Sequence, residues 1–361
     1  MQSRKVYLDA MRIVAILLVL FNHLPAYHLF HNGRGAALVG GMAMSVLTRI
    51  NVPLFAMVSG ALLLGRTESY ADLWRKRISR MLLVIVIFEA AIYVEFHFTR
   101  NYDLSLCGFL YGMLGGSLRG FTSYWFLYAY VGFLVMLPFL RSVARQMRRA
   151  DFLWLVAFQV LITTVVPLAS LVLQLAGLPA FKLSPNFVVS LSTVGLYFYP
   201  LIGFWIDRNV DVAALTRRQW AVMGVVVFGG MLMAGLATWA YDENFKGYTQ
   251  NYLGLTVYLT TAFVFLTFKR IFSAATFTAP QAATAPGALA ARVLTTVGSL
   301  VFGVYLMDQA LKLVLYEEIK PTITHAIGTF GFSLVWCLVS LVICGAATWI
   351  LKRLPLFRNI L

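Results

Sequence analysis

Long apolar stretches alternate with short polar segments along the whole chain. Ten of these stretches approach the ~20 residues that a helix needs to cross the hydrocarbon core of a bilayer. They lie at about 8–29, 43–64, 81–99, 124–140, 152–175, 187–206, 220–240, 251–270, 293–315 and 330–351. The pattern predicts an all-α integral membrane protein with about ten transmembrane helices, folded as a single polytopic domain over 1–361.

The basic residues predict the orientation of these helices. Of the 29 lysines and arginines, twenty lie in segments on the same side as the N-terminus and eight on the other side, while Arg12 falls inside the first stretch. Basic loops favour the cytoplasmic side of a membrane. We therefore expect both termini in the cytoplasm. The longest outer connection, about 100–123, is Gly-rich and amphipathic, and we expect it to lie at the outer interface or to dip back into the protein. The inner segment 271–291 is expected to be a flexible linker.

Composition supports a membrane protein and narrows the partners. Only 12% of the 361 residues are charged and 60% are hydrophobic, whereas soluble domains carry roughly 25% charged residues. The net charge is +15, but most of the basic residues lie in short segments between the apolar stretches, as a topology signal would, so nucleic acid is not expected as a partner. Cys337 and Cys344 are separated by ~10 Å of helical rise, too far for a disulfide. The histidines His23, His28 and His31 predict no metal site.

The first apolar stretch contains two ionisable side chains on one seam. Arg12 and His23 are eleven positions apart, which on an α-helix is within ~20° of the same face and ~16 Å along the axis. Ionisable groups inside a bilayer are costly and usually face a polar cavity. The seam suits a site reached from both sides of the membrane. Two structural alternatives stay open: Asp9 and Arg12 could simply form an ion pair, and His23 could be a hydrogen-bonded packing residue.

Three further carboxyl groups fall inside the predicted spans, namely Glu89, Glu95 and Asp308. Glu89 could pair with His23 or with an arginine, or it could be a structural carboxyl with its hydrogen bonds satisfied. Asp308 has Lys312 at the i,i+4 position, where a structural ion pair would form.

Five sequence elements, in order along the chain, carry a resemblance to a known family. They are Tyr7-Leu8-Asp9-Ala10-Met11-Arg12 with Asn22-His23, Asn51-Val52-Pro53-Leu54-Phe55 with Ser59-Gly60, Arg77-Ile78-Ser79-Arg80, Tyr124-Trp125-Phe126-Leu127 and Phe302-Gly303-Val304-Tyr305-Leu306. Together they resemble the acyltransferase family 3 membrane O-acyltransferases, over essentially the whole chain. The short single-domain members that acetylate cell-surface glycans are the most similar in overall appearance.

The resemblance implies an enzyme of the bacterial inner membrane that uses acetyl-CoA or another acyl-CoA as co-substrate. The acceptor would be a hydroxyl of a glycan or a lipid-linked sugar. His23 would be the general base, and Arg12, Arg77 and Arg80 would bind the phosphates of coenzyme A, which guanidinium groups hold well. An acyl-histidine intermediate stays open beside direct transfer. Loop arginines are equally explained by topology alone.

The chain departs from the family pattern in the ninth predicted span. Met307-Asp308-Gln309 stands where the family usually continues into histidine. Asp308 would therefore replace that residue or orient an imidazole, or the role of the histidine is vacant in this chain. Arg49, Trp125 and Tyr128 are candidates for binding the sugar. The alternatives are a helix anchor for Arg49 and an aromatic belt for Trp125 and Tyr128.

Two other classes of function share these features. A transporter or flippase of polysaccharide intermediates or organic anions would have the same span count and a cationic inner face. A membrane sensor or scaffold would leave the intramembrane arginine and histidine without a role. Binding of acyl-CoA separates the enzyme from both, and the oligomeric state stays open.

Overall fold

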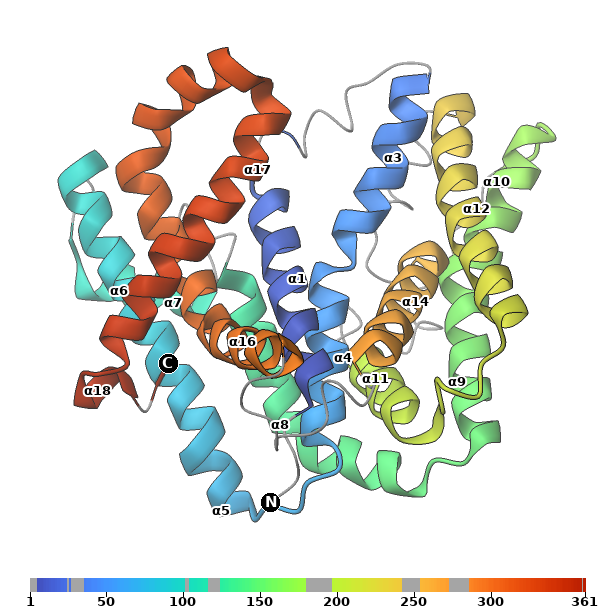
Figure 1. The fold of residues 1–361 in the computed structure, drawn as a ribbon, viewed down its shortest axis with the longest axis horizontal. Helices are drawn as coiled ribbons and strands as arrows, with labels where there is room; N and C mark the ends of the chain where they lie inside the picture. Colours follow the sequence, from blue (N-terminus) through green and yellow to red (C-terminus); the bar gives the residue numbers. More distant parts are fainter. Residues whose placement is uncertain are drawn as a thin grey trace. The chain divides into compact units, whose positions relative to one another are not determined.

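The structure is a computed structural model that describes residues 5–24, 26, 36–100, 104–115, 124–179, 197–241, 254–272, 286–358, 360 and 361. All regular secondary structure in these residues is helical (Figure 1). The chain divides into two compact units, each built from two separate segments. Unit 1 comprises Met1–Gly65 and Leu140–Gly298, and unit 2 comprises Arg66–Phe139 and Ser299–Leu361. Whether they form the single domain expected over 1–361 stays a prediction.

Six helical stretches in the described residues are long and apolar enough to cross a membrane. They are Leu38–Leu63, Tyr70–Phe98, Trp125–Gln146, Arg217–Leu236, Leu255–Phe272 and Leu289–Leu351. The last of these contains two of the predicted spans. All-helical membrane character is thereby confirmed, while the count of ten and the cytoplasmic termini stay predictions. The first part of the predicted span 187–206, most of the linker 271–291, and His28 and His31 lie outside the described residues.

Unit 1 consists of helices, several of which pack against α4. Its elements are α1 (Val6–Asn22), α3 (Ala36–Arg49), α4 (Asn51–Leu63), α9 (Arg149–Val160), the π-helix η3 (Leu161–Val165), α10 (Val166–Leu175), α11 (Phe198–Asn209), α12 (Arg217–Tyr241) and α14 (Leu255–Phe272). α4 and α11 touch backbone to backbone, because a Cβ at Gly60 would overlap Pro200 and one at Gly203 would overlap Met57. Glycine at both positions therefore permits the close approach of the two helices.

The first helix is shorter than the apolar stretch that predicted it. α1 ends at Asn22, and His23 is its C-cap with φ −89° and ψ 8°. Pro25 follows two residues later, and the residue before a proline is disfavoured in the α conformation. The helix therefore stops before the apolar run does, which leaves His23 at the helix end.

The span from α3 to α4 is bent between Arg49 and Asn51 (Figure 1). Pro53 has no N–H to give to the carbonyl of Arg49, one turn earlier, and its ring crowds that carbonyl. The N–H of Val52 donates to the side chain of Asn51 at 2.6 Å instead of to the carbonyl of Thr48. Two hydrogen bonds of a regular helix are thus missing at this point, and the carbonyl of Thr48 is released for another donor.

Unit 2 surrounds an apolar core. Its elements are α5 (Tyr70–Leu73), the π-helix η1 (Trp74–Ile78), α6 (Ser79–Arg100), α7 (Leu106–Gly115), the first part of α8 (Trp125–Gln146), the last part of α16 (Pro286–Leu311), the π-helix η5 (Lys312–Tyr316), α17 (Glu317–Leu351) and α18 (Pro355–Arg358). α17 is kinked at Gly328, whose φ of 74° suits glycine. The Tyr124 hydroxyl donates to the Leu306 carbonyl at 2.5 Å within this core.

The outer connection predicted at 100–123 contains the short apolar helix α7 in its described part. Phe109 and Gly112 are buried, whereas Leu106, Tyr111 and Leu114 are exposed. One side of α7 therefore packs on the rest of unit 2, whereas other apolar side chains of the helix are exposed. This amphipathic placement is the one expected of a segment at a membrane interface.

Candidate functional site

The seam predicted on the first helix is present in α1 of unit 1. α1 is continuous from Val6 to Asn22, so Arg12 and His23 keep their helical spacing up to the C-cap. Arg12 Nη1 lies 3.4 Å from Asp9 Oδ1, which confirms the predicted pair. The Asp9 side chain is 4% exposed and that of Arg12 is 33% exposed. The acidic side chain is thus buried, whereas part of the Arg12 side chain is exposed.

Small residues make room for Asp9 next to α16. A Cβ added at Gly298 would lie 2.7 Å from Asp9 Cβ, closer than two carbons can approach. Gly298 therefore allows the two helices to meet at the acidic residue. This packing holds Asp9 in place, and Asp9 in turn limits the orientations of Arg12.

The other end of α1 meets the bend between α3 and α4. Asn22 Nδ2 donates to the Thr48 carbonyl at 3.4 Å, the carbonyl released by the bend. Because a carbonyl can only accept, this contact orients the Asn22 amide with its oxygen turned away from Thr48. His23 follows directly in the chain and its Nδ1 is buried. The Asn22-His23 element and the element that starts at Asn51 therefore lie next to each other in the structure.

The bend is lined by buried polar side chains. Ser45, Thr48 and Asn51 are between 0% and 3% exposed, and Thr48 Oγ1 donates to the Ser45 carbonyl at 3.0 Å. Ser45 Oγ and Asn22 Oδ1 are buried and have no hydrogen-bond partner in the described part of the chain. Buried polar atoms are normally hydrogen-bonded, so such atoms point to a water or ligand. Arg49, predicted to bind substrate, ends α3 at the same bend.

Arg77 and Arg80, predicted to bind the donor, lie in helices of unit 2 and not in a loop, Arg77 in η1 and Arg80 in α6, and both have protein partners there. Arg77 Nε lies 3.0 and 2.9 Å from the two carboxylate oxygens of Glu68, and the side chains are 24% and 12% exposed. Arg80 Nε donates to the Ile360 carbonyl at 3.2 Å. A phosphate ligand would therefore compete with Glu68 for Arg77.

Asp308 forms the ion pair that the sequence offered as one alternative. Its Oδ2 lies 2.9 Å from Lys312 Nζ, and its Oδ1 accepts from the Ser340 hydroxyl at 2.9 Å. Lys312 opens the π-helix η5, a local widening often found at functional sites. The side chains of Asp308 and Lys312 are 2% and 15% exposed, so this ion pair is largely buried.

Glu89 also has a defined partner in unit 2. Its Oε1 lies 2.7 Å from the hydroxyl of Tyr128, which is a candidate for sugar binding on α8. Trp125, the first residue of α8, is half-buried. In the residues that the structure describes, neither a histidine nor an arginine pairs with Glu89.

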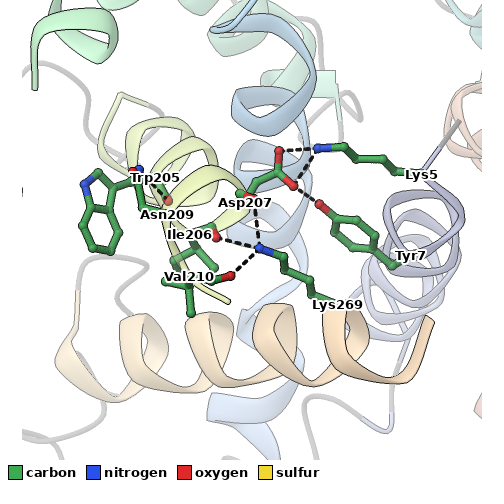
Figure 2. Close-up of polar contacts among 8 residues, drawn as sticks. All are labelled: Lys5, Tyr7, Trp205, Ile206, Asp207, Asn209, Val210 and Lys269. Carbon is green, nitrogen blue, oxygen red and sulfur yellow. Dashed lines mark hydrogen bonds and ion pairs between the residues drawn. The ribbon is translucent and has the colours of Figure 1, made fainter. Parts of the chain in front are cut away.

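A polar cluster around the buried carboxylate of Asp207, which the sequence did not predict, joins the ends of three helices in unit 1. Asp207, on α11, is 3% exposed and accepts from Lys5 Nζ at 2.9 and 2.6 Å and from the Tyr7 hydroxyl. Lys269, on α14, donates to the carbonyls of Ile206, Asp207 and Val210 at 3.0, 2.9 and 2.6 Å. Figure 2 shows Lys5, just before α1, and Tyr7, in its first turn, reaching Asp207, and Lys269 reaching the end of α11 from α14.

The predicted site residues divide between the two units. Arg12, His23 and Arg49 belong to unit 1, and the structure brings His23 and Arg49 to the same bend through the Asn22–Thr48 contact. The remaining six belong to unit 2, namely Arg77, Arg80, Glu89, Trp125, Tyr128 and Asp308. The roles of all nine stay predictions.

Comparison with known families identifies the chain. The family model of an acyltransferase domain matches residues 5–349, which include most of both units. No curated protein and no solved structure matches this chain. The chain therefore belongs to acyltransferase family 3, a family of membrane acyltransferases.

Proposed function

We propose that this protein transfers an acyl group, in particular acetyl, from cytoplasmic acyl-CoA to a hydroxyl of a cell-surface or lipid-linked glycan. It would do so in the bacterial inner membrane, as a protein with ten spans and cytoplasmic termini. The observation that carries the proposal is the bend between α3 and α4, where buried polar groups meet the histidine end of α1. Irregular backbone within a span is tolerated where it lines a cavity or is covered by protein, and it often marks a binding site.

His23 is the proposed general base. It takes the proton of the acceptor hydroxyl as the oxygen attacks the thioester carbonyl. The carbon–sulfur bond then breaks, coenzyme A leaves as a thiolate, and the proton held by His23 returns to that sulfur. Asn22 Oδ1 and Ser45 Oγ, both buried at the bend, support this assignment because they can hydrogen-bond to an approaching hydroxyl.

Arg12 is the proposed donor-binding residue in unit 1. Its side chain is one third exposed although Asp9 is buried beside it, which supports access for a phosphate. Guanidinium and phosphate form strong charge-assisted hydrogen bonds. In unit 2, Arg77 and Arg80 are proposed to bind phosphates of coenzyme A, with phosphate exchanging for Glu68 at Arg77.

The other candidates complete the proposal. Arg49, Trp125 and Tyr128 would contact the sugar. Asp308 would perform the role of the family's histidine by orienting a partner side chain. The ion pair with Lys312 would stabilise its negative charge. Glu89 would take part in catalysis through its carboxyl group. Acyl transfer to His23 itself, followed by transfer to the hydroxyl, is a variant of the same scheme.

The first test is turnover of acetyl-CoA by the full chain in lipid nanodiscs. We expect slow hydrolysis without acceptor that falls about 100-fold or more in His23→Ala, the range for loss of a general base. Arg12→Ala should weaken binding of acetyl-CoA. His97→Ala and Arg145→Ala, which change the same residue types outside the candidate site, serve as matched controls.

Two results would contradict this proposal. Undiminished hydrolysis in His23→Ala would remove the histidine from catalysis. Absence of binding of any acyl-CoA by the folded protein would reject acyl transfer, and would favour transport of glycan intermediates, for which a bent span is also suited.

A further inference from the structure

Glu89 is a carboxyl group in apolar surroundings. It lies in the middle of α6 and is 2% exposed. Its neighbours along the helix, including Ile85, Phe88 and Ile92, belong to the apolar core of unit 2. In the described part of the chain Tyr128 is its single hydrogen-bond partner, and the second oxygen, Oε2, is buried without one.

The hydrogen atoms around Tyr128 can be counted. The Tyr128 oxygen lies 2.7 Å from Glu89 Oε1 and 2.9 Å from the Met113 carbonyl oxygen. A phenol has one hydrogen, and a carbonyl can only accept, so the hydroxyl must donate to Met113 to make that hydrogen bond. An ionised carboxylate can also only accept. It would then face the lone pairs of Tyr128 at 2.7 Å with no hydrogen between the two oxygens.

A proton on Glu89 satisfies both contacts. The carboxylic acid donates to the Tyr128 oxygen, and Tyr128 donates to the Met113 carbonyl. Burial points the same way, because an ionised carboxylate away from water is costly unless a cation pairs with it, and such groups usually neutralise. No cationic side chain pairs with Glu89 among the residues described.

We infer that Glu89 is a neutral carboxylic acid in the resting protein and that it donates the first hydrogen bond of a chain from Glu89 through Tyr128 to Met113. The chain joins α6, α8 and α7, and thereby fixes the short outer helix α7 to the core of unit 2. In this state Glu89 is a proton donor and not a counter-ion for an arginine or a protonated histidine. The inference does not depend on the proposed acyl transfer.

Infrared difference spectroscopy of the full chain in nanodiscs at neutral pH tests the protonation directly. Subtracting Glu89→Gln from the wild type should reveal the carbonyl band of one carboxylic acid, which shifts in D2O. Glu68→Gln is the matched control: Glu68 pairs with Arg77, so that difference should show a carboxylate instead. A carboxylate band lost in Glu89→Gln would overturn the inference.

Two more variants test the hydrogen-bond chain. Glutamine has the shape of a protonated glutamate and can donate to Tyr128, so Glu89→Gln should fold and unfold at the wild-type temperature. Failure of this variant to fold would contradict a neutral Glu89. In Tyr128→Phe the acid band should persist at a shifted frequency, because its acceptor is gone, and an unshifted band would overturn the donation to Tyr128.

Discussion

Basic side chains in this protein reach backbone carbonyls at the ends of helices other than their own. Lys269 of α14 donates to three carbonyls at the end of α11. Arg141 donates through Nε to the carbonyl of Leu63, the last residue of α4, at 3.0 Å. The last carbonyls of a helix lack partners within it, and the helix dipole favours a cation there. Basic residues that mark topology in the sequence therefore also close helix ends in unit 1.

Replacing Lys269 by methionine should destabilise unit 1. The change keeps the length of the side chain but leaves three partly buried carbonyls without their shared donor, and an unsatisfied group costs about 1–3 kcal/mol. Thermal unfolding in nanodiscs measures the loss. Lys76→Met is the matched control, because Lys76 forms an exposed pair with Asp72 and should have no measurable effect. Equal effects of the two changes would contradict the capping role of Lys269.

Contacts between residues close together in the chain can be predicted from sequence, and contacts between residues far apart in the chain cannot. The Asp9–Arg12 and Asp308–Lys312 pairs follow from helical spacing alone, because three or four residues bring side chains to one face. Asp207 accepts from Lys5, 202 residues away in the chain, and no pattern within either segment signals the other. The same holds for Tyr128 as the partner of Glu89.

At the scale of elements, two of the family's sequence elements in unit 1 meet at the bend between α3 and α4. They are Asn22-His23 and the element that begins at Asn51. Pro53 predicts a break in a helix, and the structure confirms the bend at the turn before it. The sequence does not predict that Asn22 takes the released carbonyl of Thr48, because this depends on how α1 packs on α3. The motif at Asn51–Gly60 thus begins at the bend and ends at the contact with α11.

The close contact between α4 and α11 yields a prediction about Gly60. Gly60→Ala places a methyl group in the backbone of Pro200, and overpacking of this kind costs about 1–3 kcal/mol. Thermal unfolding and the yield of folded protein measure the effect. Gly40→Ala on α3 is the control, since nothing lies within 4 Å of its added Cβ and alanine favours a helix. A fully stable Gly60→Ala would contradict the backbone contact.

At the scale of the molecule, hydropathy predicts where helices lie but not how they group. Each of the ten apolar stretches overlaps a described helix, because burial in lipid demands apolar length whatever the neighbours. The division into two units, each made of two distant segments, depends on packing between helices and leaves no mark in the hydropathy pattern. Hydropathy therefore could not show that the candidate site residues fall into two groups.

The proposed orientation can be measured with the native cysteines. Cys107 on α7 is exposed, whereas Cys337 and Cys344 are buried. If the connection containing α7 faces outward, a membrane-impermeant maleimide should label intact cells at Cys107 alone, and Cys107→Ser should abolish the labelling. Labelling that requires opened membranes would reverse the proposed topology.

The order of the segments along the chain determines when each unit can assemble during translation. Arg66–Phe139 leaves the ribosome well before Ser299–Leu361, which completes the same unit. Until then Tyr124 lacks the carbonyl of Leu306 and Arg80 lacks that of Ile360. A nascent chain that has been made as far as Gly298 holds all of unit 1 and only half of unit 2. The early helices of unit 2 are consequently the segments that most need shelter by the insertion machinery.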